Sequence, residues 1–317
     1  MRLLPPTLVA GALVVAALLT TGAAAPLPPL PKGDAIELLD DVRILSDDRM
    51  QGRAPDTPGS LMARNYIIKR LIQIGVKPLS KAGFQQPFVI KAGGKTLYGV
   101  NLVGVIPGRQ KGGRVMVVTA HYDHLGVKNG EIYNGADDNA SGVAGLLAVA
   151  ESFRRHPPKH TIIFVALDGE ELGLLGAQAY VTNPIVPLER IALNVNFDML
   201  SKNAKGELYA SGATPWPILK PRLDAIAAVA PVKLLQGHDS GKLDQDDWTN
   251  QSDHYAFAQK KIPWVYFGVE DHPEYHKPTD DFATIPQDFF KASGATVVAA
   301  CRLFDDELDH IGREAGR

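Results

Sequence analysis

The stretch RVMVVTAHYDHLG, residues 114–126, decides the predicted fold, because imidazole and carboxyl groups follow directly after an apolar run. The run Val115–Ala120 is typical of a buried strand. Two further apolar runs end in the same way, Thr161–Leu167 before DGEELG (168–173) and Ile191–Phe197 before Asp198. Since ligands bind at the carboxyl ends of strands in open α/β sheets, these polar groups are expected to meet at one rim.

Strands and helices alternate from Arg114 onward, which predicts an α/β fold with a mostly parallel, twisted central sheet flanked by helices. The expected helices cover residues 35–45, 60–74, 143–153, 174–181, 217–228 and a long segment that opens near Pro286. The remaining expected strands are 88–91 and 96–106, which form an edge hairpin, and 262–268. In the second helix we expect Leu61, Ile68, Leu71 and Ile72 to form one stripe and Gly75 to stop the helix.

Residues 1–25 have the layout of a secretory signal peptide, with a positive start, a short apolar run and a tail of small residues. An uncleaved membrane anchor is the alternative interpretation. Residues 26–33 are expected to be a Pro-rich linker, and residues 34–317 a single domain. The chain is therefore expected to be exported to the periplasm or secreted, with no stable membrane span after signal removal.

Charge and cysteine content exclude several classes of protein. The formal net charge is −2 and no basic run is present, which argues against a nucleic-acid partner. Cys301 is the only cysteine, so the chain forms no internal disulfide. The composition, 45% hydrophobic and 21% charged, is that of an ordinary globular protein.

The polar groups at the strand ends suit zinc, because imidazole and carboxylate are zinc ligands and a two-metal site needs a bridging carboxylate. Asp123 is spaced to accept the second N–H of a metal-bound His121. His124 competes with His121 for the role of metal ligand. The alternative interpretation of His124 is a loop histidine with a solvent or backbone partner. In NGADDNASG (134–142) one acid could bridge two metals, or the acids and Asn139 could simply cap the next helix.

Glu170 and Glu171 are adjacent and can point in different directions, so one can bind metal while the other acts as a general base. The alternative is that these acids favour the first turn of the following helix. Asp198 directly follows an apolar strand, where a carboxylate is unusual unless it has a specific function. His276 follows the last strand in EYHKPTD (274–280) and, taken alone, reads as a loop histidine.

These motifs, in this order, resemble those of zinc-dependent exopeptidases of the co-catalytic di-zinc aminopeptidase type. Glutamate carboxypeptidase, glutaminyl cyclase and the transferrin receptor ectodomain are relatives of that family. The resemblance runs from about Ile36 to the C-terminus and implies a three-layer sandwich of the zinc-exopeptidase, phosphorylase/hydrolase-like kind with two zinc ions per chain. It implies a peptide or aminoacyl substrate, cleaved at the N-terminal peptide bond.

The resemblance also implies roles for individual residues. The implied ligands are His121 and Asp198 on one zinc, Glu171 and His276 on the other, and Asp138 as the bridge, with a cis peptide bond to Asn139. Glu170 matches the general base and Asp123 the partner of His121. Tyr275 matches a position that polarises the scissile carbonyl in some members. Asp253 and His254 belong to an SDH motif that recurs near the substrate site.

Glutaminyl-cyclase relatives work with one zinc, so an intact set of five ligands weighs against that activity. Two alternatives stay open beside an aminopeptidase. One is a carboxypeptidase or a deacylase of amino-acid conjugates on the same scaffold, and the other is a non-catalytic envelope binding protein with structural zinc. The polar segment 237–251 contains Trp248 and is expected to shape the substrate pocket. Manganese or cobalt also suits such a mixed nitrogen and oxygen site.

Overall fold

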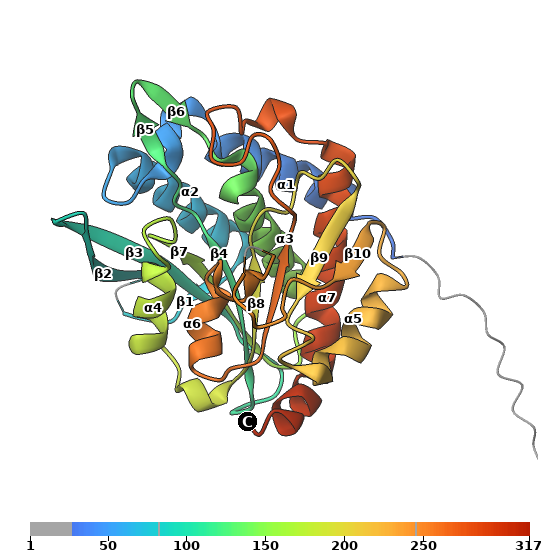
Figure 1. The fold of residues 1–317 in the computed structure, drawn as a ribbon. Helices are drawn as coiled ribbons and strands as arrows, with labels where there is room; N and C mark the ends of the chain where they lie inside the picture. Colours follow the sequence, from blue (N-terminus) through green and yellow to red (C-terminus); the bar gives the residue numbers. More distant parts are fainter. Residues whose placement is uncertain (1–26, 82, 245) are drawn as a thin grey trace, which may run out of the picture.

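The computed structural model describes residues 27–81, 83–244 and 246–317. In this part of the chain eight strands pair in the order β1-β3-β7-β4-β8-β11-β9-β10, and β2 pairs with β3 (Figure 1). The strands of this sheet are β1 (Lys77–Pro78), β2 (Gln85–Ala92), β3 (Lys95–Ile106), β4 (Val115–His121), β7 (Thr161–Leu167), β8 (Ile191–Phe197), β9 (Glu207–Ser211), β10 (Lys233–Gln236) and β11 (Trp264–Gly268). The central strands β7, β4, β8 and β11 are parallel to one another.

Helices cover both faces of the sheet. The α-helices are α1 (Lys32–Leu45), α2 (Pro58–Ile74), α3 (Gly142–Arg155), α4 (Leu175–Thr182), α5 (Lys220–Ala227), α6 (His254–Gln259) and α7 (Gln287–Glu314). Short helical turns are η1 (Asp48–Arg53), η2 (Ala136–Ser141), η3 (Leu188–Arg190), η4 (Pro217–Leu219), η5 (Trp248–Asn250) and η6 (Phe282–Thr284). One core joins α1, α2, α3, α5 and α7 to one face, and a second core joins α4 and α6 to the other.

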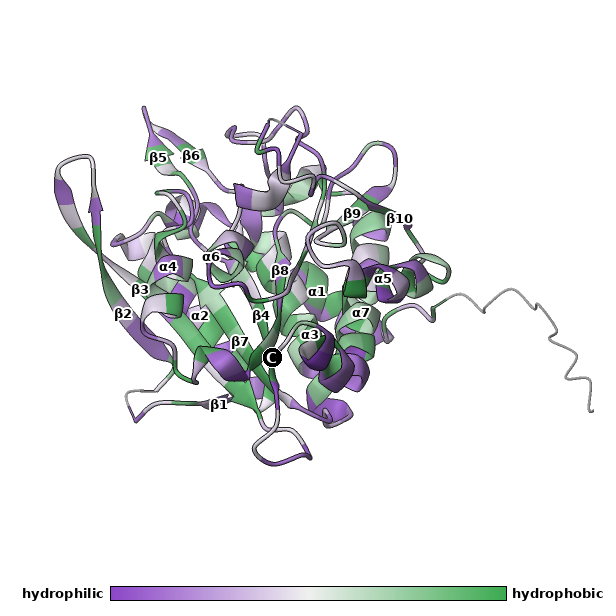
Figure 2. Ribbon diagram, turned by 60° about the horizontal axis from the view of Figure 1, so that its bottom comes forward, coloured by the Kyte–Doolittle hydropathy of each residue, from purple (hydrophilic) through white to green (hydrophobic). Residues whose placement is uncertain are grey.

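The central strands are apolar on both sides because both faces of the sheet are covered. Every residue of β4 and β8 is buried. In β4, Met116 and Val118 belong to the core of the first face, and Val115 and Val117 to that of the second. Figure 2 shows this hydrophobic centre in green beneath more polar outer elements. The predicted fold class is thus confirmed.

Two details differ from the sequence prediction. In α2, Leu61 and Ile72 are exposed, and the buried face runs through Ala63, Ile67, Leu71 and Ile74. Of the predicted stripe, Leu71 is buried and Ile68 packs against the core, whereas Leu61 and Ile72 point to solvent, so the buried face is rotated from the predicted one. The helix does end at Gly75, which adopts a left-handed φ of 90° that glycine accepts without a steric penalty.

The expected N-terminal linker is only partly irregular. Lys32 and Gly33 begin α1, and the Leu27 N–H donates to the Val229 carbonyl at 2.7 Å. The expected signal peptide lies outside the described residues. None of the helices in the described part of the chain is long and apolar enough to cross a membrane.

Several short elements were not predicted. They are β1, β9, β10, α6 and the small hairpin of β5 (Gly126–Lys128) and β6 (Glu131–Tyr133). Strand β9 runs antiparallel to β11, which makes the sheet mixed beyond its parallel centre.

Candidate metal centre

The polar groups identified in the sequence converge beyond the carboxyl ends of the parallel strands. His121 is the last residue of β4, and Asp198 follows the last residue of β8. Glu170 and Glu171 lie in the loop after β7, and His276 lies in the loop after β11. Strand register explains the convergence: His121 lies opposite Leu167 on β7, and Phe197 lies opposite Phe267 on β11.

His121, Asp138 and Asp198 form the first group. The His121 Nε2 atom lies 3.1 Å from Asp198 Oδ1 and 3.4 Å from Asp138 Oδ1. All three residues are buried, and one donor atom of each lies within 4.8 Å of the others. Burial opposes the charged imidazole, but the carboxylates of Asp198 and Glu170 raise the pKa of His121 well above its ordinary value.

Glu171, Asp138 and two imidazoles form the second group. His276 Nε2 lies 3.0 Å from Asp138 Oδ2 and 3.3 Å from Glu171 Oε2. His124 Nδ1 lies 2.6 Å from Glu171 Oε1 and 3.7 Å from Asp138 Oδ2. His124 is buried, and neither of its ring nitrogens makes a hydrogen bond within the described residues. His124 therefore faces the carboxylates of the second group.

Three consecutive polar residues of the turn η2, which are Asp137, Asp138 and Asn139, make different contacts. Asn139 Oδ1 accepts the N–H groups of Gly142 and Met199, as a helix cap does. Asp137 Oδ1 accepts the Ser201 N–H at 2.7 Å. Asp138 keeps its carboxylate between the two groups, and its peptide bond to Asn139 is cis, as the resemblance implied. The capping interpretation thus applies to Asn139, and the bridging role of Asp138 stays a prediction.

Asp123 supports the centre in a way that the sequence did not predict. Its carboxylate accepts the N–H groups of Glu170 at 3.1 Å and Glu171 at 3.3 Å. His121 Nδ1 lies 3.2 Å from the backbone carbonyl of Asp123 and 3.7 Å from its carboxylate. The carbonyl is therefore the nearer partner of the imidazole, while the carboxylate fixes the loop that carries both glutamates.

Asp198 is oriented by buried side chains behind it. The Ser252 hydroxyl donates to Asp198 Oδ2 at 2.7 Å and accepts from Asn196 Nδ2 at 2.8 Å. Thr119 Oγ1 on β4 donates in turn to Asn196 Oδ1 at 2.6 Å. This chain of hydrogen bonds leaves Asp198 Oδ1 as the oxygen that faces His121.

Glu170 and Tyr275 line the cavity over the two groups. Burial raises the pKa of Glu170 well above its ordinary value, and Asp198 adds to the effect. No hydrogen bond or ion pair within the described residues engages the Glu170 carboxylate. Tyr275 stacks on His276 with ring centroids 3.9 Å apart. Both side chains are therefore placed to act on a molecule in the cavity.

The expected substrate residues fall in two places. Trp248 lines the cavity, where it stacks on His238 at a centroid distance of 3.9 Å. Asp253 and His254 are fully buried and are not among the lining residues, so direct substrate contact is not supported for them. Instead, His254 Nε2 donates to the Trp248 carbonyl at 3.0 Å, and burial lowers the pKa of His254 to about 4. His254 thus anchors the segment that bears Trp248.

Gln251, within the segment expected to shape the pocket, also lines the cavity, whereas sequence reasoning missed the lining residues Met199, Tyr266, Val269 and Asp271. Asp271 precedes Tyr275 by four residues in the loop after β11, and this proximity to the EYHKPTD motif was the available signal. Tyr266 donates its hydroxyl to the Asp198 backbone carbonyl at 3.2 Å. Its place on a buried strand gave no such signal.

The residues present fit a pair of metal ions. Both groups mix imidazole nitrogen with carboxylate oxygen, the donor set that zinc accepts. His124 Nδ1 and Glu171 Oε1 lie 2.6 Å apart, while the buried His124 Nε2 has no hydrogen-bond partner within the described residues, which is costly unless a further partner binds there. No lysine or arginine is among the residues that line the cavity, so only imidazoles oppose the charge of its acids.

Comparison with known proteins agrees with this geometry. The model of Peptidase family M28 matches residues 101–301. Aminopeptidase YwaD of Bacillus subtilis (strain 168) is 30% identical over 215 residues, which cover 63% of this chain and 43% of that protein. The chain spans about half the length of the curated relatives it matches.

Solved structures share the fold. A Zn-dependent exopeptidase from Parabacteroides distasonis ATCC 8503 superposes with a TM-score of 0.68 at 20% identity, covering 87% of this chain and 99% of that one. Glutaminyl cyclase from Porphyromonas gingivalis superposes with a TM-score of 0.70 at 20% identity, covering 88% and 99%.

Proposed function

Because the chain belongs to peptidase family M28, we propose that it is a zinc-dependent aminopeptidase that hydrolyses the N-terminal peptide bond of peptides or aminoacyl conjugates. One observation carries the proposal. Asp138 lies between two groups of zinc-type donors, and the unengaged carboxylate of Glu170 lines the same cavity. A purely structural metal site has no use for an unengaged base.

The proposed ligands follow the two groups. His121 and Asp198 would hold one zinc, Glu171 and His276 would hold the other, and Asp138 would contribute to both. His124 faces the second position and is proposed to support the same ion. When bound, two zinc ions supply Lewis acidity that eases the deprotonation of water and polarises a carbonyl.

The chain's own residues supply the proton transfer. Glu170 is proposed to take a proton from the attacking water and to pass it to the leaving amine, since its carboxylate lines the cavity and is engaged by no hydrogen bond or ion pair within the described residues. Tyr275 can donate its hydroxyl to the developing oxyanion, since burial raises the pKa of Tyr275 and keeps it protonated. Asp123 holds the Glu170 backbone while the carboxylate moves the proton.

Charge in the cavity favours a free amino group over a carboxylate on the substrate. The lining contains no lysine or arginine to bind a substrate carboxylate, and it contains the exposed acid Asp271. A carboxypeptidase needs a positively charged side chain in the cavity to bind the carboxylate of its substrate. Trp248 supplies an aromatic wall that is proposed to contact the substrate side chain, in agreement with the role expected for segment 237–251.

A panel of chromogenic substrates tests the proposal. Aminoacyl-anilides with a free amine should be cleaved, whereas their N-acetylated forms should not, because only the former pairs with the acidic cavity. Cleavage of only blocked or carboxyl-terminal substrates would move the activity to a deacylase or carboxypeptidase. Ammonia release from an N-terminal glutaminyl peptide without anilide cleavage would show a cyclase.

Export is also part of the proposal, and it is supported by the signal-like pattern of residues 1–25. N-terminal sequencing of protein from the periplasm or culture medium should give a chain that begins near residue 26. Recovery of chains that still begin at Met1 in the membrane fraction would contradict it.

A further inference from the structure

A buried guanidinium lies beneath the metal centre and plays no part in the chemistry described above. Arg53 is the last residue of η1, between α1 and α2, and its exposed fraction is 0%. Within the described residues no carboxylate lies within ion-pair distance of it. A buried arginine without a paired acid is costly and needs a reason.

Four hydrogen bonds supply the partners of Arg53, and all are backbone carbonyls. Nε donates to Tyr122 at 2.7 Å, and Nη2 donates to Gly135 at 2.9 Å. Nη1 donates to Leu45 at 2.7 Å and to Asn134 at 2.6 Å. Only arginine has a planar fork with enough N–H donors for such a set.

The carbonyls belong to the segments that carry the proposed ligands. Tyr122 lies between His121 and Asp123, directly after β4. Asn134 and Gly135 precede η2, which carries Asp138. The same guanidinium therefore joins the loop of the first group to the turn that supplies the bridging acid, and it fixes both to the end of α1 at Leu45.

The charge of Arg53 also suits this position. Burial lowers the pKa of Arg53 to about 10, while Asp138, Asp123, Asp280 and Glu171 attract the charged form. The guanidinium thus stays protonated at neutral pH and donates to all four carbonyls. Arg53 is not among the residues that line the cavity, so its charge acts on these acids without reaching into it.

The backbone of η1 is shaped to deliver this side chain. Gln51, Gly52 and Arg53 have φ values of 48°, 62° and 53°, a left-handed conformation that is costly for the two residues other than glycine. A Cβ atom on Gly52 would lie 2.3 Å from the Tyr133 carbonyl oxygen. Close approach of η1 to the β5–β6 hairpin therefore requires glycine, and Figure 1 shows this blue segment beside the hairpin.

We propose that Arg53 is a positioning residue that sets the spacing between the His121 loop and the Asp138 turn, and so determines how tightly the centre holds zinc. This inference rests on the proposed function only in taking zinc as the ion. It assigns a role in the site to the segment SDDRMQGRAPDTPG (46–59), which the sequence indicates only as a turn-rich loop.

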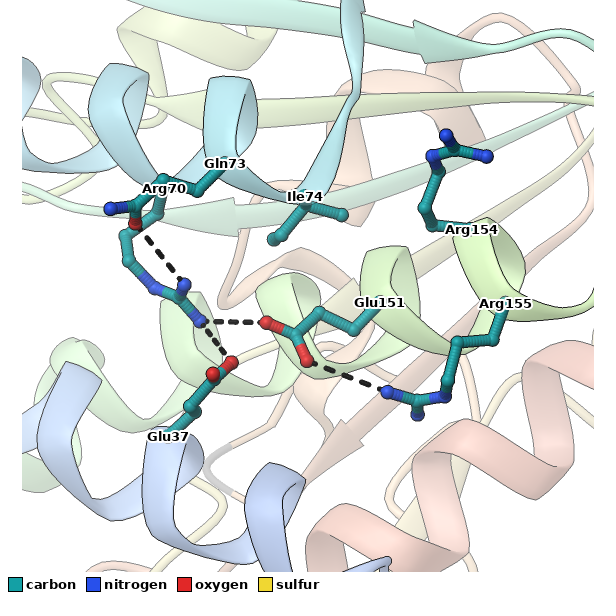
Figure 3. A pocket seen from close by; sticks show the side chains of 7 residues that line it. All are labelled: Glu37, Arg70, Gln73, Ile74, Glu151, Arg154 and Arg155. Carbon is teal, nitrogen blue, oxygen red and sulfur yellow. Dashed lines mark hydrogen bonds and ion pairs between the residues drawn. The ribbon is translucent and has the colours of Figure 1, made fainter.

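Zinc affinity, measured by competition with a chromogenic chelator, tests the inference without any substrate. Wild type is compared with Arg53→Met, Arg53→Lys and the control Arg70→Met, with thermal unfolding of each metal-free protein recorded in parallel. Arg70 is a suitable control because it binds Glu37, Asp41 and Glu151 where α1, α2 and α3 meet, and it does not line the cavity. Figure 3 shows its contacts with Glu37 and Glu151.

Arg53→Met should bind zinc about 10- to 100-fold more weakly, the usual effect of losing a group that orients metal ligands. Arg53→Lys keeps the charge but cannot reach all four carbonyls, so its affinity should also fall at least tenfold. Arg70→Met should unfold at a lower temperature yet bind zinc as wild type does.

Two outcomes overturn the inference. One is wild-type zinc affinity in folded Arg53→Lys, which decides the question alone if Arg53→Met does not fold. The other is an equal loss of affinity in Arg70→Met, which would reduce the effect to general destabilisation. Absence of zinc binding by wild type would instead contradict the proposed function. Failure of the proposed function can therefore be told apart from failure of the inference about Arg53.

Discussion

At the level of single residues, three consecutive side chains of η2 have different partners. Asn139 Oδ1 accepts backbone N–H groups, and Asp137 accepts the Ser201 N–H and lies 3.0 Å from His272 Nε2. The Asp138 carboxylate instead faces imidazoles of both groups. Because several buried acids and imidazoles meet there, a metal ion is expected at Asp138.

Replacing the two histidines of the second group tests this assignment. His276→Ala should retain about one zinc per chain, because only the ion at Asp138 and Glu171 loses a ligand. His124→Ala should lower the affinity for the same ion by about 10- to 100-fold, the range found for residues that support metal ligands. Zinc counts and chelator competition measure both effects.

His156→Ala provides the control, since His156 is exposed at the end of α3. Unchanged zinc affinity in His124→Ala would show that the imidazole only packs against Glu171. Loss of both ions in His276→Ala would show that the two groups do not bind independently.

At the level of elements, the strand ends could be read from the sequence because apolar runs stop at polar residues. Thr161–Leu167 and Ile191–Phe197 were predicted with their observed bounds. The short elements β9, β10 and α6 were missed, since four to six residues carry too little periodicity to be recognised. The predicted α2 stripe is wrong at Leu61 and Ile72, which are exposed, because the buried face runs through Ala63, Ile67 and Ile74 together with the predicted Leu71.

Contacts that join distant segments could not be predicted in this way. Arg53 bonds to carbonyls up to 82 residues away in sequence, and backbone carbonyls have no sequence signature. The burial of Asp253 and His254 depends on how α6 packs against β8 and β11. The proposed ligands could be predicted from the sequence because each follows a recognisable strand or belongs to a recognisable motif.

The junction of α1, α2 and α3 makes a prediction about pH. Burial and the neighbouring acid Glu37 raise the pKa of Glu151 from 4.5 to about 7, against the effect of Arg70 (Figure 3). The folded chain thus binds an extra proton between about pH 4.5 and 7, and its stability falls as pH rises through this window. Glu151→Gln should remove that fall and raise the unfolding midpoint at pH 8 by a few degrees.

Thermal unfolding between pH 5 and 8 measures this effect, with Glu131→Gln as an exposed control. At pH 5 the variant and wild type should have the same unfolding midpoint. A lower midpoint for Glu151→Gln at pH 8 would mean that the Glu151 charge stabilises Arg70 more than its burial costs.

At the level of the whole molecule, zinc should contribute to stability because buried acids surround its site. An ion that binds only the folded chain at about 100 times its Kd adds about 2.7 kcal/mol. For a domain of this size, 1 kcal/mol shifts the midpoint by about 2–4 °C, so a chelator should lower it by about 5–11 °C. The same chelator saturated with calcium is the control, and an unchanged midpoint would contradict a metal centre within the folded chain.

The most direct measurement compares wild type with Glu170→Gln, counting zinc and following aminoacyl-anilide cleavage in both proteins. Glutamine keeps the size of the side chain but cannot accept a proton. The account predicts about two zinc ions per chain in each protein and a rate about 10²- to 10⁴-fold lower in the variant, the usual contribution of general acid–base catalysis. A variant that keeps its zinc and cleaves as fast as wild type would contradict Glu170 as the base and, with it, the proposed mechanism.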